Sequence, residues 1–187
     1  SNTKENMSVN ICNSYCLSSS KILFDEASNY VEQVLGLTPI ILSSQFEGDV
    51  KSLTRLYKNA IKDISRPDSP IKKPAVIFSG GEVEIKLPEY YGKGGRNSQF
   101  SLALSKEIDG IECVTVLSAD TDGIDGNGEN AGAIVDSATY RLARKYYPKE
   151  DPVRLFDSFH IHKKLNTLFC TGPTGINLND FRAALVR

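Results

Sequence analysis

Three loops rich in Gly, Asn and Asp hold most of the side chains in this sequence that could bind or transform a ligand. They span residues 92–97, 121–126 and 171–175, and each follows an apolar run typical of a strand. In open α/β sheets, the ligand crevice lies beyond the carboxyl ends of the strands. We therefore expect the three loops to line a single cleft rather than to form three unrelated turns.

The first loop combines glycines with an arginine at the start of a predicted helix. Gly92, Gly94 and Gly95 allow a close approach of the backbone to a ligand. The helix that follows would direct free N–H groups and the positive end of its dipole toward that ligand. Arg96 can hold a carboxylate or phosphoryl group through two parallel hydrogen bonds and can stabilise charge on a phosphoryl group in transfer. The alternative is a glycine-rich turn that carries a solvated arginine.

Two common nucleotide-binding motifs are missing from the sequence. The glycines of the first loop do not form GxGxxG, because Asn97 occupies the third glycine position. The patterns GxxxxGKS and GxxxxGKT occur nowhere. The sequence therefore gives no support for a Rossmann-type dinucleotide site or a P-loop within this chain.

The second loop carries three carboxylates directly after a buried strand, those of Asp120, Asp122 and Asp125. They could bind Mg²⁺ beside a phosphate, although the spacing excludes an EF-hand, whose obligatory glycine would fall on Asp125. The alternative is that these side chains form Asx turns and stabilise glycine-rich bends. We expect backbone N–H groups of residues 123–126 to offset the mutual repulsion, so that Asp122 and Asp125 face the cleft without a tightly bound metal.

The third loop offers uncharged hydrogen-bonding groups. With the residues that follow it, this loop contributes Thr171, Gly172, Thr174, Gly175, Asn177, Asn179 and Asp180. These groups suit the hydroxyls of a ligand or brace the neighbouring loops, and a hydrogen-bonded turn between two strands explains them equally well. His160 and His162 are the only histidines, and we expect neither a metal site nor a catalytic triad from them.

The composition argues against several classes of protein. The 187 residues carry 22 Lys and Arg against 23 Asp and Glu, so the net charge of −1 creates no field that would attract nucleic acid or an anionic membrane. The longest apolar runs, such as residues 75–78 and 114–117, are far shorter than the roughly 20 residues of a membrane helix. Four cysteines without a zinc-binding pattern, and no recognisable signal peptide, are typical of a reduced, cytoplasmic protein.

The first 65 residues alternate between strand and helix patterns. Residues 9–12 and 39–42 predict strands, whereas residues 19–35 and 50–65 predict amphipathic helices capped by serine and by Asp49. This rhythm is that of a parallel α/β sheet.

The remaining chain predicts further strands and helices. Residues 75–79 and 83–87 predict two strands around Gly80-Gly81, which is a hairpin signal. The pattern then predicts a helix after the first loop, a strand at 113–118, helices at about 130–146 and 152–165, and strands at 167–170 and 183–186. We therefore predict an α/β fold with a layered, partly parallel mixed sheet flanked by helices, and with a β-hairpin near residues 75–87.

The loops also resemble successive motifs of a known family, the MOFRL domain of glycerate 2-kinases. The motifs are Gly94-Gly95-Arg96-Asn97 before an Ala- and Leu-rich helix, residues 121–126, Ala131-Gly132-Ala133, and residues 171–175 followed by Asn177, Asn179 and Asp180. The resemblance covers roughly residue 75 to the C-terminus. Residues 8–65, with the turn Ser79-Gly80-Gly81-Glu82, resemble the segment that precedes this domain. The sequence departs from the family at Ser98-Gln99, where Gln-Glu is usual, and at Ile176, which replaces Thr.

The resemblance implies a division of labour between two domains. Residues 1–74 would be an α/β segment preceding the MOFRL core, and residues 75–187 the core itself, together forming one C-terminal domain of a longer enzyme. The N-terminal domain of family members is thought to hold the catalytic lysine and much of the nucleotide site. The implied reaction is the ATP- and Mg²⁺-dependent phosphorylation of D-glycerate to 2-phosphoglycerate in a cleft between the two domains.

In this interpretation, Arg96 is the catalytic residue, and Asp122 and Asp125 are weak candidates for Mg²⁺. The substrate-binding candidates are Gly94, Gly95, Asn97, Thr121, Asp122, Gly123, Asp125, Thr171, Thr174 and Asn177. Members of the same family have also been named hydroxypyruvate reductase, an activity that needs a nicotinamide site and is disfavoured here by the missing GxGxxG. A non-catalytic metabolite-binding module and a homodimer stay open as alternatives.

Overall fold

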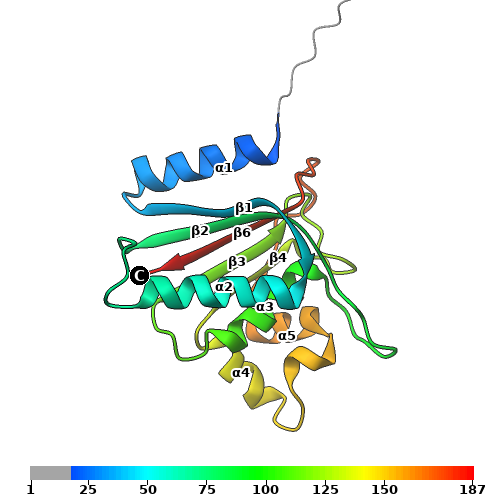
Figure 1. Cartoon of the computed structure of the whole chain (residues 1–187). Helices are drawn as coiled ribbons and strands as arrows, with labels where there is room; N and C mark the ends of the chain where they lie inside the picture. Colours follow the sequence, from blue (N-terminus) through cyan, green and yellow to red (C-terminus); the bar gives the residue numbers. More distant parts are fainter. Residues whose placement is uncertain (1–17) are drawn as a thin grey trace, which may run out of the picture.

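A mixed six-stranded sheet forms the centre of the computed structural model, which describes residues 18–187 (Figure 1). In spatial order, the strands are β1 (Thr38–Asp49), β2 (Ala75–Glu84), β6 (Asp180–Val186), β3 (Val114–Asp120), β4 (Gly132–Asp136) and β5 (Leu168–Phe169). The β1–β2 pair is parallel and the other neighbours are antiparallel. The predicted partly parallel mixed sheet is therefore confirmed. The strand predicted at residues 9–12 lies outside the described residues.

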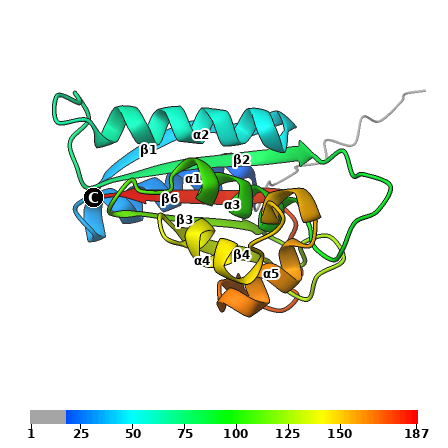
Figure 2. The same ribbon diagram turned by 90° about the horizontal axis from the view of Figure 1, so that it is seen from below.

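Helices cover both faces of this sheet. They are α1 (Ser20–Asn29), which continues into one stretch of π-helix, η1 (Tyr30–Val34), then α2 (Val50–Ser65), α3 (Arg96–Glu107), α4 (Thr139–Tyr146), the short 3-10 helix η2 (Pro152–Leu155) and α5 (Ser158–Leu165). Helix α1 lies alone on one face, and α2 to α5 lie on the other (Figures 1 and 2). No helix within residues 18–187 has the length and apolar character that a membrane crossing requires.

Alternate residues of β2 face the two helical layers. Ala75 and Ile77 belong to the core that also contains side chains of α2 and α3. Val76 and Phe78 point the other way and pack with Phe24 of α1. A strand covered on both faces reads as a continuous apolar run, which explains the pattern of residues 75–78.

Local sequence signals set the boundaries of the first two helices. Ser19 accepts a hydrogen bond from the backbone N–H of Ile22 at 3.2 Å, and Asp49 accepts one from Ser52 at 2.6 Å. Each therefore caps a helix as its residue type predicts. Helix α2 ends at Ser65, directly before Arg66-Pro67, where a following proline disfavours helical backbone.

The hairpin predicted near residues 75–87 is wrong. Residues 75–84 form one strand, β2, which pairs in parallel with β1 from Thr38 as far as Asp49. Gly81 does not turn the chain: its φ of +89° accompanies a register irregularity in β1, and a Cβ there would lie 2.2 Å from the backbone nitrogen of Phe46. The glycine allows close approach of a neighbouring strand, a role that sequence reasoning cannot separate from a turn.

The single helix predicted at residues 130–146 is also wrong. Its first part is strand β4, which pairs with β3, and only Thr139–Tyr146 is helical. Gly132 makes this pairing possible, since a Cβ there would lie 1.8 Å from the carbonyl oxygen of Ser118. Pairing with a distant strand therefore overrides the helix-like pattern.

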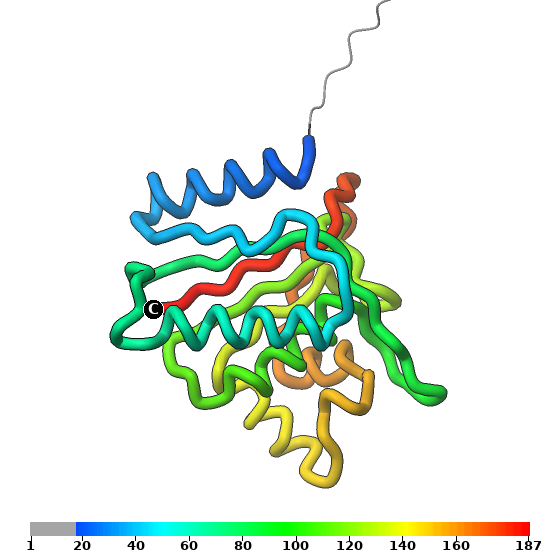
Figure 3. Tube along the Cα trace, in the orientation of Figure 1, coloured from blue at the N-terminus to red at the C-terminus, as the bar shows by residue number. Residues whose placement is uncertain are grey.

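Other predicted elements are present in the expected order but begin or end at different residues. The strand predicted at 39–42 extends to Thr38–Asp49, and the one at 183–186 begins earlier, at Asp180. The segment 152–165 divides into η2 and α5 because Phe156 adopts left-handed backbone with φ of 48°. Figure 3 shows that the chain between β2 and α3 protrudes from the rest of the molecule before it returns to the start of α3. This segment includes the first loop.

Candidate functional site

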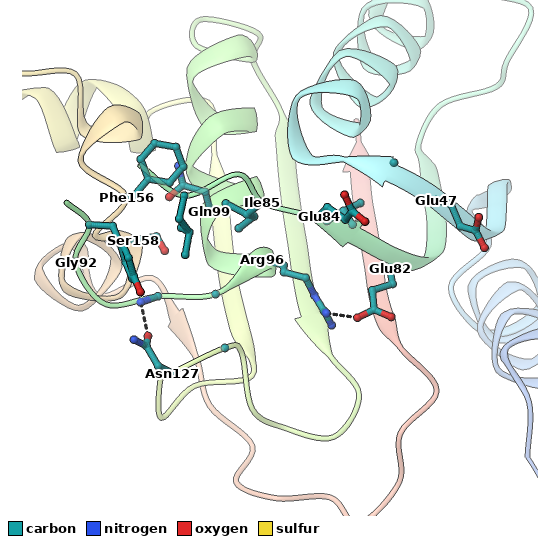
Figure 4. A pocket seen from close by; sticks show the side chains of 17 residues that line it. Glu47, Glu82, Glu84, Ile85, Gly92, Arg96, Gln99, Asn127, Phe156 and Ser158 are labelled. Carbon is teal, nitrogen blue, oxygen red and sulfur yellow. Dashed lines mark hydrogen bonds and ion pairs between the residues drawn. The ribbon is translucent and has the colours of Figure 1, made fainter. Parts of the chain in front are cut away.

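The first and second loops pack directly on each other. The backbone N–H of Gly94 donates to the side-chain oxygen of Asn127 at 2.8 Å, a contact drawn in Figure 4. A Cβ at Gly95 would lie 2.3 Å from a carboxylate oxygen of Asp125, and one at Gly126 would lie 2.6 Å from the carbonyl oxygen of Gly94. Gly95 and Gly126 are thus required for contact between loops, whereas the sequence suggested that first-loop glycines serve a ligand.

Asp125 serves as the cap of helix α3. Its carboxylate accepts hydrogen bonds from the backbone N–H groups of Asn97 at 2.9 Å and Ser98 at 2.7 Å, and from the Ser98 hydroxyl at 2.5 Å. The residue is 1% exposed, and burial raises the pKa of its carboxyl while the Ser98 and Asn97 bonds oppose that rise. The expectation that Asp125 faces the cleft is wrong, because α3 takes up both oxygens. For the same reason, these two N–H groups are not free for an external anion.

The third loop is tied to the second. The backbone N–H of Thr174 donates to the carbonyl oxygen of Asp122 at 3.0 Å, and the Thr174 hydroxyl donates to the carbonyl oxygen of Thr121 at 2.5 Å. The Thr121 hydroxyl in turn accepts from the N–H of Leu178 at 2.7 Å. A Cβ on Gly123 would lie 2.0 Å from the carbonyl oxygen of Gly172. The second loop therefore packs against both of the others, and the third loop braces it.

Arg96 is surrounded by carboxylates. Its guanidinium pairs with Glu82, which follows Gly81 in β2 (Figure 4). It also lies 3.1 Å from an oxygen of Asp120 and 3.3 Å from one of Asp180. The Arg96 side chain is 30% exposed. The arginine predicted to bind a ligand anion thus already has intramolecular acidic partners, and a ligand would have to compete with them.

The environment of Asp120 changes its acidity. Burial raises the pKa of its carboxyl to about 6. The nearby charges of Asp180 and Asp122 also raise this pKa, while the backbone N–H of Asp122 and the charge of Arg96 oppose the rise.

Behind Arg96 lies a buried polar network that the sequence signalled only in part. The Asp180 carboxylate accepts from the Asn97 side chain at 2.7 Å and pairs with the guanidinium of Arg182. Arg182 donates to the carbonyl oxygen of Gly80 at 3.2 Å, and Asn97 accepts from the hydroxyl of Ser118 at 2.5 Å. Asn97 is therefore a buried bracing residue. The sequence did not indicate that Arg182 is buried, because a single charged residue within an apolar strand is typical of a surface position.

A pocket of about 1110 Å³ opens beside this cluster. Gly94, Gly95 and Arg96 line it together with the ends of β1 and β2, residues 126–127 of the second loop, and Phe156 and Ser158 (Figure 4). The expectation that all three loops line one cleft is wrong for the third loop, which contributes no residue to this wall. The remaining candidates do not line the pocket: Asn97, Thr121, Asp122, Gly123, Asp125, Thr171, Thr174 and Asn177. The charged side chains of its wall are Glu47, Glu82, Glu84 and Arg96, so the wall is acidic overall.

His162 is a structural residue. Its Nε2 donates to the backbone oxygen of Ser98 at 2.9 Å, so its Nδ1 accepts from the Thr167 hydroxyl at 2.7 Å. Complete burial lowers its pKa to about 4, so the ring is neutral near neutral pH. Within residues 18–187, no group of three or more His, Cys, Asp and Glu side chains is arranged to hold a metal ion.

The fold and the site define a class, an α/β domain with an open, glycine-lined pocket beside an arginine and carboxylate cluster at one edge of a mixed sheet. The chain belongs to the MOFRL family, whose profile matches residues 75–180. This match confirms the resemblance of the loop motifs to that family.

Known proteins resemble the chain well beyond that segment. The D-glycerate 2-kinase of Thermotoga maritima is 34% identical over 165 residues, which are 87% of this chain and 39% of that protein. A relative from Agrobacterium vitis, which its name assigns provisionally to the hydroxypyruvate reductases, is 38% identical over 86% of this chain and 42% of its own length. A crystal structure of glycerate kinase from Thermotoga maritima superposes with a TM-score of 0.83 at 33% identity, over 91% of this chain and 41% of that one. The chain thus spans about two fifths of these relatives.

Proposed function

We propose that this chain is the C-terminal domain of a glycerate 2-kinase and supplies one wall of an interdomain active site. The observation that carries the proposal is the open pocket beside Arg96, in a fold shared with glycerate kinase. The reaction transfers the γ-phosphoryl group of ATP to the 2-hydroxyl oxygen of D-glycerate. It releases ADP and the hydroxyl proton.

In this proposal, Arg96 contacts the transferred phosphoryl group or the carboxylate of glycerate. Its position at the start of α3 is fixed by Asp120 and Asp180, while Glu82 is the more exposed partner. An anionic substrate group can replace Glu82 at the guanidinium without disturbing the buried contacts. The backbone of Gly94 and Gly95 then lies beside the substrate.

The acidic wall supports the need for a second domain. Glu47, Glu82 and Glu84 oppose a single Arg96, so this wall alone repels glycerate and ATP. Positive groups from the opposite wall would reverse that balance, and the N-terminal domain of family members is where the resemblance places a catalytic lysine. We therefore propose that this N-terminal domain and D-glycerate are the partners of the chain.

The residues described here do not by themselves fit a magnesium site. Asp125 is committed to α3, and Asp122 accepts the backbone N–H of Ile124 at 2.8 Å. We therefore assign no Mg²⁺ ligand and no step through Mg²⁺ to residues 18–187. ATP use follows from the kinase assignment, and the groups that hold ATP and its metal are proposed to come mainly from the other domain.

The name of the Agrobacterium vitis relative favours a second candidate, hydroxypyruvate reduction. One experiment separates the two. The intact protein that contains this domain is assayed for ADP release with D-glycerate and ATP, and separately for NADH or NADPH oxidation with hydroxypyruvate. We expect ADP release only, and none from the 187-residue chain alone, because positioning for phosphoryl transfer needs both walls. Reduced-nicotinamide oxidation without ADP release would establish the reductase instead. The absence of both activities would favour a non-catalytic metabolite-binding module.

A further inference from the structure

A second cavity, of about 600 Å³, lies between α2 and α3 beside the main pocket. The two cavities share a wall formed by Glu84, Ile85, Gln99 and Phe156. Figure 4 labels all four of these side chains among those that line the main pocket. The second cavity therefore lies next to the pocket of the proposed active site, across this shared wall.

The charge of this cavity is opposite to that of the main pocket. Its wall carries six basic and four acidic side chains, in a chain whose net charge is −1. Lys58 and Lys106 are paired with acidic neighbours. Four cations have no ion-pair partner within the described part of the chain, and we name the cavity the basic groove after them: Lys51, Arg55, Lys86 and Arg154.

The acidic residues of the groove are largely occupied. Glu107 pairs with Lys58, and Asp151 pairs with Lys106 at 2.5 Å. Asp49 accepts the N–H of Ser52 at the start of α2. The groove therefore presents more uncommitted positive than negative charge, and the cations come from three separate segments of the chain.

The side chain of Gln99 is a second, independent indication that a ligand binds in the basic groove. It is 4% exposed, and its side-chain nitrogen donates to the backbone oxygen of Val153 at 2.8 Å. Its side-chain oxygen has no hydrogen-bond partner among residues 18–187. A buried acceptor without a donor costs free energy, so a hydroxyl group brought to this wall would stabilise it after a small shift of the side chain.

We propose that the basic groove binds a small phosphorylated metabolite that carries two or more anionic groups and a hydroxyl. Two arginines can each hold a phosphoryl or carboxylate group through paired hydrogen bonds. Because the cations surround the groove, a ligand with several anionic groups engages more of them than a single anion does. This site goes beyond the proposed function and does not depend on phosphoryl transfer in the main pocket.

Calorimetric titration of the 187-residue chain with sodium pyrophosphate at low salt tests the site. We expect saturable binding at one site and about tenfold weaker binding in Arg55→Gln, since each lost charge-assisted contact removes roughly a factor of ten. The matched control is Lys62→Gln, which removes a positive charge from the same helix outside the groove and should change the affinity by less than about twofold.

Amide chemical-shift mapping in the same titration locates the bound anion. We expect shifts around Lys51, Arg55, Lys86 and Arg154. Titrations with ATP and 2-phosphoglycerate identify the source: binding of either that weakens in Arg55→Gln supports the site and shows whether a nucleotide or a phosphorylated acid fits it. The inference is overturned by the absence of saturable heat with all three probes, by equal weakening in Lys62→Gln, or by shifts confined to residues 92–96. No kinase assay enters this test, so its failure leaves the proposed function standing.

Discussion

At the scale of single residues, the site depends on how Arg96 and Arg182 share their acidic partners. Asp180 contacts both guanidinium groups and the Asn97 amide, so one fully buried carboxylate joins the start of α3 to β6. Glu82 completes the set from β2. The position of Arg96 therefore depends on side chains from three elements.

Arg96→Ala in the intact protein should lower kcat by about 10²-fold or more, which is the usual effect of removing a hydrogen-bond donor to the transition state. Arg96→Lys should recover little of this loss, because a point charge cannot reproduce the paired hydrogen bonds of a guanidinium. Steady-state kinetics with D-glycerate and ATP measure the effect. Arg141→Ala, which removes an exposed arginine paired with Asp109, is the control and should leave kcat unchanged. Near-wild-type kcat in Arg96→Ala would make Arg96 a structural residue.

Asp180→Asn should destabilise the chain by about 3–5 kcal/mol, because it leaves the buried Arg182 without a compensating charge. Urea unfolding followed by circular dichroism gives this free energy. Asp25→Asn, at the exposed pair with Lys21, should cost less than about 1 kcal/mol. If the two variants cost the same, the buried network does not stabilise the fold as described.

At the scale of elements, helix α3 and the second loop behave as one unit. Asp125 is 28 residues from Asn97 in sequence, yet it caps the helix on which Arg96 lies. His162 holds α5 against the same helix turn through the backbone oxygen of Ser98. The orientation of the first residues of α3 is thus determined by segments distant in the chain.

Asp125→Ala should cost about 2–4 kcal/mol in unfolding free energy, since it leaves two backbone N–H groups and a hydroxyl buried without an acceptor. Asp49→Ala removes an exposed helix cap and should cost clearly less than Asp125→Ala. Denaturant unfolding compares the two variants. Hydrogen exchange at Asn97 and Ser98 should also accelerate in Asp125→Ala. Equal losses in both variants would show that the loop and α3 are not coupled.

At the scale of the whole molecule, two buried groups give stability opposite dependences on pH. His162 has a folded-state pKa of about 4, below its ordinary value of 6.5, so the unfolded state binds more protons between these values and stability falls as the pH falls. Asp120 has a raised pKa of about 6, so the folded state binds more protons between pH 3.8 and 6 and stability rises as the pH falls.

Comparison of the wild type with His162→Gln isolates the histidine contribution. Between pH 7 and 4, the wild type should lose about 3 kcal/mol more unfolding free energy than His162→Gln, from a pKa difference of about 2.5 at 1.36 kcal/mol for each pKa unit. Urea unfolding at several pH values measures this difference. A wild-type slope in His162→Gln would contradict the burial of a neutral ring.

The sequence by itself determined the features that depend on neighbouring residues. The caps at Ser19 and Asp49, the extent of α2, the start of α3 at Arg96 and the apolar run of β2 all follow from local residue types and periodicity. The order and spacing of the glycine-rich loops also predicted that these loops meet and which family they belong to.

Only the tertiary structure decided which side chains face a ligand and which hold the fold together. Asp125 and Asn97 were candidates for the cleft, but their partners lie far away in sequence and turn them inward. Gly81 predicted a turn, yet β1 approaches it and makes it part of a strand. Glycine and aspartate suit turns, caps and ligand contacts equally well, because these roles use the same backbone freedom and the same oxygen acceptors. The choice among them depends on contacts between segments brought together by folding, which local sequence does not specify.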